Sequence, residues 1–147
     1  MTIVETDDFA VEVPAGWNRT AVQGSGTVVF RAESGSGQLT INAKRLKSGL
    51  SNDDLVRTVE EIMNARLVAE RALGAPRIDG PSYENADGAA WSTYTAFDKV
   101  KGRKVVCHVI AEDGYVGQVY LECAGAKDAE FNDLANMVLK SIRFAVN

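Results

Sequence analysis

The chain contains few side chains whose type and spacing could support chemistry. Its one histidine, His108, lies in the middle of a predicted strand. A catalytic imidazole works beside a nucleophile and an orienting acid, and the sequence near His108 carries no signature of either. We therefore expect His108 to be a hydrogen-bonded histidine of a sheet. The functional alternative is a proton switch near neutral pH.

Metal ligation is not indicated either. Cys107 and Cys123 are isolated, and the sequence has no Cys-x-x-Cys or His-Glu-x-x-His motif. The aspartate pairs 7–8 and 53–54 are adjacent in sequence, so in a strand they point to opposite faces. At a helix start, such a pair favours the helix dipole. We predict no metal and no cofactor.

Two glycine-rich segments invite comparison with phosphate-binding loops. Residues 24–27 (Gly-Ser-Gly-Thr) and 34–37 (Ser-Gly-Ser-Gly) each lead into a predicted strand and not into a helix. Both lack the structural context that gives such loops their meaning, and neither forms the Gly-x-Ser-x-Gly elbow of a nucleophilic serine. We interpret them as hairpin turns and expect no catalytic residues, so the protein is predicted not to be an enzyme.

Charge and composition narrow the class of protein further. The 147 residues are 46% hydrophobic and 24% charged, with a net charge of −4. This composition is typical of one folded domain, here spanning residues 1–147. Binding to nucleic acid depends on neutralising phosphates with basic residues, so no nucleic-acid partner is expected. Basic residues do cluster, at Lys99–Lys104 and at Lys44–Lys47. We interpret them as solubility devices on turns and edges, with a patch for an anion or an acidic partner as the alternative.

The chain start does not look like a targeting signal. The first eight residues carry three acids, whereas a secretory signal begins with basic residues and continues into an apolar run. No stretch reaches the roughly 20 apolar residues of a membrane span. We expect a cytoplasmic protein without a membrane span, unless a leader has been removed.

The hydrophobic pattern predicts an α+β fold. A helix is expected from an N-cap at Ser51 to about Leu73, and Asp128 can cap a second helix near the end of the chain. Elsewhere in the chain, apolar and polar residues alternate as they do in strands, and turn residues separate these segments. The predicted strands are Phe9–Val13, Thr27–Ala32, Gln38–Leu46, Arg77–Glu84, Ala89–Val100, Arg103–Ala111 and Tyr115–Cys123.

The last two strands predict a hairpin, and its loop length determines which residues share a face. With the three-residue loop 112–114, Val105 pairs with Leu121 and one face becomes uniformly apolar. A two-residue loop would pair Val105 with Glu122 and mix the faces. The sequence therefore favours the three-residue loop.

This register also makes predictions about cysteines and tryptophans. Cys107 and Cys123 would lie roughly 13 Å apart along the strands, beyond the limit of about 7 Å between bridged Cα atoms. We therefore expect no disulfide. Trp17 and Trp91 are expected to be largely buried.

Two end segments carry a family resemblance. The segment 9–17, Phe-Ala-Val-Glu-Val-Pro-Ala-Gly-Trp, resembles the opening strand and turn of PsbP-like and DcrB-like domains, and Ser141–Phe144 resembles their close. The resemblance implies an α/β/α sandwich, with two main helices around a curved antiparallel sheet of about six to seven strands. It implies no single function. Similar domains occur in a photosystem subunit, a nuclear import factor, envelope lipoproteins and cytoplasmic chaperones for type VI secretion effectors.

The predicted function is therefore non-catalytic binding of another protein. A bacterial secretion-related chaperone or adaptor and an immunity-type protein both fit this class, and homo-oligomers are compatible with it. The alternatives are a binder of a small apolar ligand between sheet and helix, and an enzyme without a recognised signature. The expected contact surface is a sheet face that carries more apolar side chains than solvent favours, although a helix could cover it instead. Its residues are Tyr94, Val106, His108, Ile110, Val116, Gln118 and Tyr120.

Overall fold

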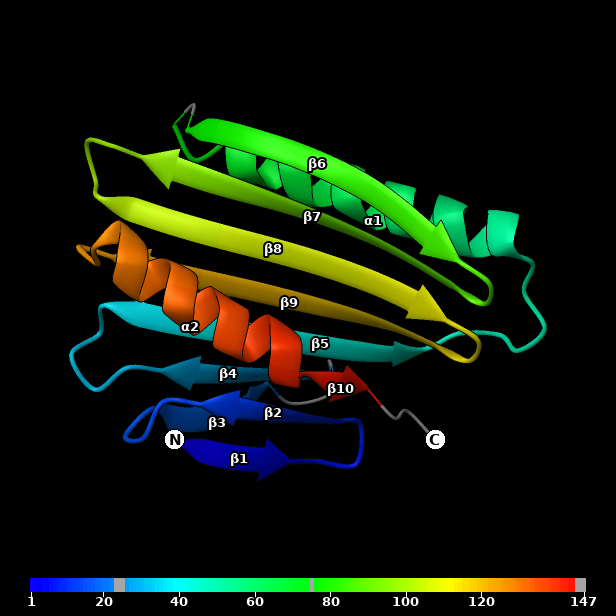
Figure 1. The fold of residues 1–147 in the computed structure, drawn as a ribbon, viewed down its shortest axis with the longest axis horizontal. Coiled ribbons are helices and arrows are strands. Elements are labelled where there is room, and N and C mark those ends of the chain that lie inside the picture. The colour runs from blue at the N-terminus through cyan, green and yellow to red at the C-terminus, as the bar shows by residue number, and fades with distance from the viewer. Residues whose placement is uncertain (23–25, 75, 145–147) are drawn as a thin grey trace.

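A seven-stranded antiparallel sheet forms the centre of the molecule in this computed structural model, which describes residues 1–22, 26–74 and 76–144. The strand order is β3-β4-β5-β9-β8-β7-β6, and Figure 1 shows the sheet curving along its length. Its strands are β3 (Asn18–Val22), β4 (Thr27–Arg31), β5 (Gly37–Arg45), β6 (Arg77–Ala86), β7 (Ala89–Asp98), β8 (Arg103–Glu112) and β9 (Tyr115–Ala124).

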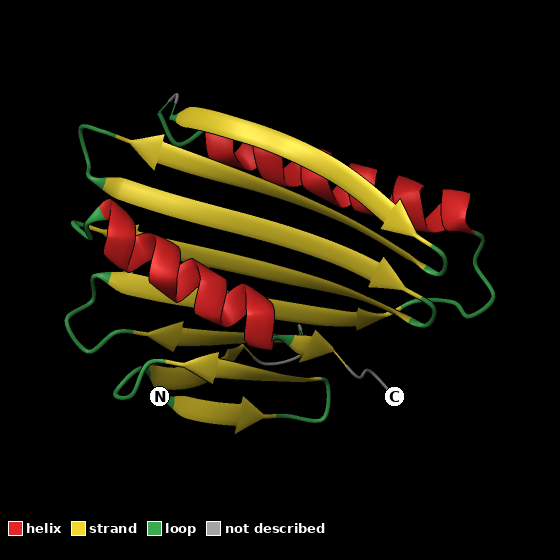
Figure 2. Cartoon of the chain, viewed as in Figure 1, coloured by secondary structure: helices red, strands yellow, loops and turns green. Residues whose placement is uncertain are grey.

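Two helices lie on opposite faces of this sheet (Figure 2). Helix α1 (Asn52–Arg71) packs over β7 and β8 on one face, and α2 (Asp128–Ser141) packs over β8 and β9 on the other. A small sheet, β1 (Thr2–Glu5), β2 (Phe9–Val13) and β10 (Arg143–Phe144), packs beside α2. The predicted α+β sandwich is confirmed. Its main sheet has seven strands, which agrees with the predicted six to seven. Neither helix of the described residues is both long and apolar enough to span a membrane.

The position of the first predicted strand is a correction. The sequence predicted a single antiparallel sheet that includes this strand, but β2 lies in the small sheet between β1 and β10. Its buried residues Phe9, Val11 and Val13 belong to the core beneath α2. The strand therefore contributes its apolar face to that core without hydrogen bonding to the large sheet.

The predicted start of α1 is confirmed. Ser51 is the N-cap and forms a capping box with Asp54, and the apolar stripe from Leu55 to Leu67 is buried. The start of α2 differs by one residue from the prediction, because Lys127 is its N-cap. Asp128 is the first helical residue, and its carboxylate lies 2.5 Å from the ammonium of Lys104.

The predicted hairpin register is wrong by one position. Glu112 pairs with Tyr115, so the loop has two residues, and Val105 lies opposite Glu122. The sequence Asp113-Gly114 suits such a two-residue turn, with Gly114 at a φ of 93°. The prediction assumed one covered face, whereas helices cover both faces of β8. Consecutive residues of this strand can therefore both be apolar.

The sequence did not reveal three short strands, β1, β3 and the two-residue β10. β3 is polar and exposed at its start, because it forms one edge of the large sheet. β1 forms an edge of the small sheet and carries an acidic residue. Of the two predicted turns, residues 34–37 form a turn in which the Ala32 amide donates to the Gly37 carbonyl. Gly24 and Ser25 of the other lie outside the described residues.

Both tryptophans are less buried than predicted. Trp17 and Trp91 are each only partly buried. The indole of Trp91 donates a hydrogen bond of 2.8 Å to the carboxylate of Glu84. Trp17 packs at the margin of the core beneath α2, where its ring leaves no room for a side chain at Gly37.

Cys107 and Cys123 are free thiols that lie on opposite faces of the sheet. Burial raises the pKa of Cys107 to about 11 and also raises that of Cys123. Because the thiolate is the reactive form, we expect neither cysteine to react rapidly in the native protein. A thiol titration after unfolding without reductant should count two thiols. A count of zero would contradict the hairpin geometry.

Candidate functional site

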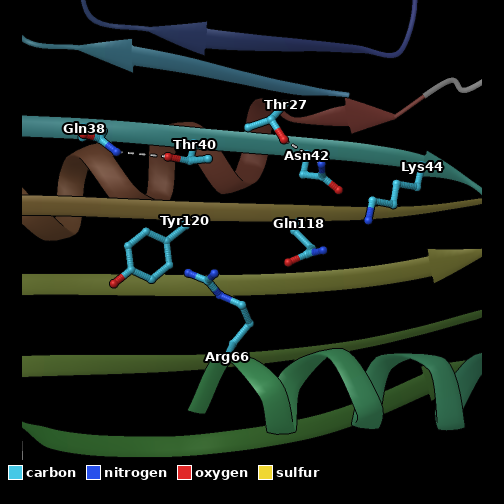
Figure 3. Close-up of a pocket in the computed structure, with 8 residues that line it drawn as sticks. All are labelled: Thr27, Gln38, Thr40, Asn42, Lys44, Arg66, Gln118 and Tyr120. Carbon is cyan, nitrogen blue, oxygen red and sulfur yellow. Dashed lines mark hydrogen bonds between the residues drawn. The ribbon is translucent and has the colours of Figure 1, made fainter. Parts of the chain in front are cut away.

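The sheet face beneath α1 is only partly covered by that helix. Beside α1, polar side chains of β4, β5 and β9 line a groove of about 400 Å³, together with one arginine from the helix (Figure 3). Its lining residues are Thr27, Gln38, Thr40, Asn42, Lys44, Arg66, Gln118 and Tyr120.

The groove follows from the alternation of β5. Successive side chains of a strand point to opposite faces, so the even-numbered residues from Gln38 to Lys44 face the groove. The odd-numbered Leu39 and Ile41 are fully buried in the core on the other face. Across the ladder, Thr40 pairs with Tyr120 and Asn42 with Gln118. Strand pairing thereby extends the polar row of β5 onto β9.

Hydrogen bonds between side chains order the floor of the groove. The Asn42 amide donates to the Thr27 hydroxyl at 2.8 Å, and the Gln38 amide donates to the Thr40 hydroxyl at 3.4 Å (Figure 3). The Arg31 side chain, on the neighbouring strand, donates a hydrogen bond of 3.2 Å to Oε1 of the Gln38 side chain. The floor therefore offers amide and hydroxyl groups in a partly ordered row.

Among the residues that the structure describes, the lining contains two cations and no acid. The guanidinium carbon of Arg66 lies 4.6 Å from the centre of the Tyr120 ring, within the range of a cation–π contact. Lys44 lies exposed at the other end of the β5 row. The groove is thus locally basic in a protein with a net charge of −4.

A buried ionic network lies behind Tyr120. Glu70, near the end of α1, is 1% exposed. Its carboxylate lies 2.7 Å from Nη1 of Arg103 and accepts hydrogen bonds from the hydroxyls of Tyr94 at 2.7 Å and Tyr120 at 2.9 Å. Arg103 also binds the Glu122 carboxylate at 2.8 Å. One arginine therefore compensates two carboxylates.

The network keeps each of its groups in one protonation state. Burial alone would raise the pKa of Glu70, but the hydrogen bonds from Arg103, Tyr94 and Tyr120 outweigh it and lower that pKa. Burial and the nearby Glu70 carboxylate raise the pKa of both tyrosines. At neutral pH, Glu70 is therefore ionised and both phenols are protonated.

Most of this network is enclosed behind the groove. The Glu70 side chain has no exposed surface, and Arg103 retains only 12% of its own. A general acid or base must reach the substrate, and Tyr120 is the one network member that lines the groove. The network therefore fixes the Tyr120 ring on which Arg66 lies.

The predicted contact residues do not form one surface, which corrects the prediction. Tyr94 and Val116 are buried on the α1 face, and Val106 is buried on the α2 face. The cause is the shifted hairpin register: Val106 pairs with Leu121 and not with Tyr120. The even-numbered residues of β8 therefore lie on the α2 face, whereas those of β9 lie on the α1 face.

The remaining predicted residues fall into two separate places. Gln118 and Tyr120 line the groove. His108 and Ile110 line a hollow of about 400 Å³ near the end of α2. His108 Nδ1 lies 2.7 Å from the Thr93 hydroxyl, and burial lowers the pKa of His108. The prediction of a hydrogen-bonded sheet histidine is confirmed.

The sequence analysis missed Gln38, Thr40 and Asn42 as candidate site residues. A signal was present, because polar residues alternate with buried apolar ones along this strand. It identified the strand, but it did not show which part of the polar face a helix would cover. Across the described ranges, no group of three or more His, Cys, Asp or Glu side chains could hold a metal ion.

Comparison with known proteins places the fold. The chain aligns with the solution structure of cyanobacterial PsbP from Synechocystis sp. PCC 6803, with a TM-score of 0.68 over 95% of this chain and 88% of that one. The fold is that of PsbP. Sequence identity is only 19%, so the likeness concerns architecture. No family model matches the chain, and no curated protein matches it.

Two further structures share the PsbP fold. LpqN of Mycobacterium tuberculosis, described as involved in cell envelope biogenesis, aligns with a TM-score of 0.58 at 14% identity, over 93% of this chain and 83% of LpqN. A protein from Bacteroides thetaiotaomicron aligns with a TM-score of 0.54 at 13% identity, over 93% of this chain and 45% of its own. The PsbP-like part of the resemblance is confirmed, and its DcrB-like part stays a prediction.

Proposed function

We propose that this PsbP-fold domain is a non-catalytic binding module that holds another polypeptide in the polar groove beside α1. The observation that carries the proposal is the part of the sheet face beside α1 that this helix leaves uncovered. Its side chains are polar and ordered by hydrogen bonds, and they repeat every second residue along β5.

The dimensions of this row suit an extended peptide. From Gln38 to Lys44 the strand rises about 20 Å, at roughly 3.3 Å per residue. An extended segment of about six residues has the same length and the same two-residue side-chain period. The amides and hydroxyls of the floor can donate to and accept from its backbone and polar side chains.

The ionisable groups favour binding over catalysis. Glu70 is enclosed and fully hydrogen-bonded, so its perturbed pKa is explained by a structural network. A small apolar ligand is the weaker alternative, because such sites are lined mainly by apolar side chains, whereas the eight lining residues here are polar.

Finer roles rest on the family resemblance. Within this class we propose a cytoplasmic chaperone or adaptor in bacterial secretion, or an immunity-type protein. LpqN is described as involved in cell envelope biogenesis, which supports an envelope role as the competing proposal. Immunolocalisation in fractionated source cells distinguishes the two.

Selection from a peptide library displayed on phage tests the proposed function. We expect the wild-type domain to enrich peptides, and a groove-filling Thr40→Trp variant to lose them. Asn85→Trp, on the exposed edge strand β6, serves as the matched control and should retain them. Circular dichroism checks that each variant is folded, and Gln118→Trp provides a second blocked groove. Peptides that bind the blocked and open grooves equally well would contradict the proposal.

A further inference from the structure

The groove holds two cations, Lys44 and Arg66. Among the described residues neither Lys44 nor Arg66 forms an ion pair. Two carboxylates adjoin lining residues of the groove, and Arg103 pairs with both: Glu122 lies opposite Gln38 in the ladder, and Glu70 accepts a hydrogen bond from Tyr120. Charge complementarity therefore points to an acidic occupant.

The spacing of the cations can be read from the sheet register. Arg66 lies over the ring of Tyr120, and Tyr120 pairs with Thr40. Lys44 follows Thr40 by four residues on the same face of β5, which is about 13 Å along the strand. In an extended peptide, side chains at positions i and i+4 share a face and are separated by the same distance.

Arg66 is also fixed in position. Its guanidinium lies on the Tyr120 ring, and the Tyr120 hydroxyl donates to the buried Glu70 carboxylate. A cation that is already ordered loses less conformational freedom when it binds a carboxylate. The planar guanidinium can also bind a carboxylate through two hydrogen bonds.

We propose that the groove recognises an extended acidic segment of a polypeptide, in which two carboxylates four residues apart contact Arg66 and Lys44. This inference rests on the proposed function and adds the chemistry and spacing of the partner. The surrounding amides and hydroxyls bind the polar backbone of the segment between the two charges.

Fluorescence anisotropy with three labelled twelve-residue peptides tests the spacing. All share a Ser/Thr background; the first carries two Glu at i and i+4, the second two Gln there, and the third two Glu at i and i+3. We expect the first to bind about tenfold more tightly than the third, which keeps one of the two charge-assisted contacts, and about a hundredfold more tightly than the second, which keeps neither. Its affinity should fall as salt is added.

Substitution of each groove cation tests whether that side chain contacts the peptide. Lys44→Gln and Arg66→Gln should each weaken the first peptide about tenfold, whereas Lys140→Gln, exposed on α2 at the opposite face, should leave it unchanged. Lys44 is exposed, so its variant tests the inference even if Arg66→Gln proves unstable. Equal binding of the Glu and Gln peptides, equal binding of the two Glu spacings, or no binding of any peptide would overturn the inference. The proposed function would still stand if the phage library yields groove-dependent peptides without acidic residues.

Discussion

Replacing Glu70 by alanine is expected to lower the free energy of unfolding by about 3–5 kcal/mol, because it removes the buried one of the two carboxylates that pair with a nearly buried arginine. Arg103 would keep only Glu122, and the hydroxyls of Tyr94 and Tyr120 would lose their shared acceptor. Urea or guanidinium denaturation followed by circular dichroism measures the change.

The matched control is Glu60→Ala, an exposed acidic residue of the same helix. A surface change of this kind is expected to stay within about 0.5 kcal/mol. If Glu70→Ala changes stability no more than Glu60→Ala does, the buried network described here is wrong.

The same variant predicts a dependence on pH. The pKa of Glu70 in the folded protein lies below its ordinary value of 4.5. Its stabilising contribution is therefore fully present above that ordinary value, and it is lost as the pH falls through the lower folded pKa. The difference in unfolding free energy between wild type and Glu70→Ala should therefore shrink as the pH is lowered below 4.5. A difference that grows on acidification would contradict the assigned charge states.

Two consecutive residues of β8 are expected to be equally intolerant of charge. Val105 faces α1 with 0% exposure, and Val106 faces α2 with 4% exposure. Val105→Asp and Val106→Asp should each cost about 4 kcal/mol or more, because each buries a carboxylate without a partner. Soluble yield and the denaturation midpoint measure the loss.

Val68→Asp is the control, because this valine of α1 is 67% exposed and should tolerate the change. In a sheet with one covered face, only one of two consecutive strand residues would be sensitive. Normal stability of either Val105→Asp or Val106→Asp would contradict the two-faced core.

Local signals predicted the elements that depend on neighbouring residues. The capping box at Ser51 and the stripe that ends at Leu67 place α1 correctly, because a helix start and its buried face are encoded within a few turns. The polar strand β3 was missed, since an exposed edge strand needs no apolar alternation.

Long-range features could not be predicted in the same way. The hairpin register depended on whether one or both faces of β8 are covered, and that depends on where α2 packs. The pair Glu70–Arg103 joins residues 33 positions apart, and nothing in either local sequence indicates the other. The groove arises because α1 covers β7 and β8 and leaves the polar side of β5 uncovered, which follows from tertiary packing and not from the pattern of β5 itself.

Mapping amide chemical shifts in a titration with a library-selected peptide tests the central claim most directly. We predict that the largest shifts fall on residues 38–44 of β5 and 116–120 of β9, and that they disappear in the Thr40→Trp variant. Shifts concentrated around His108 and Phe144 at the opposite face, or along the edge strand β6, would contradict the assignment of the groove as the binding surface.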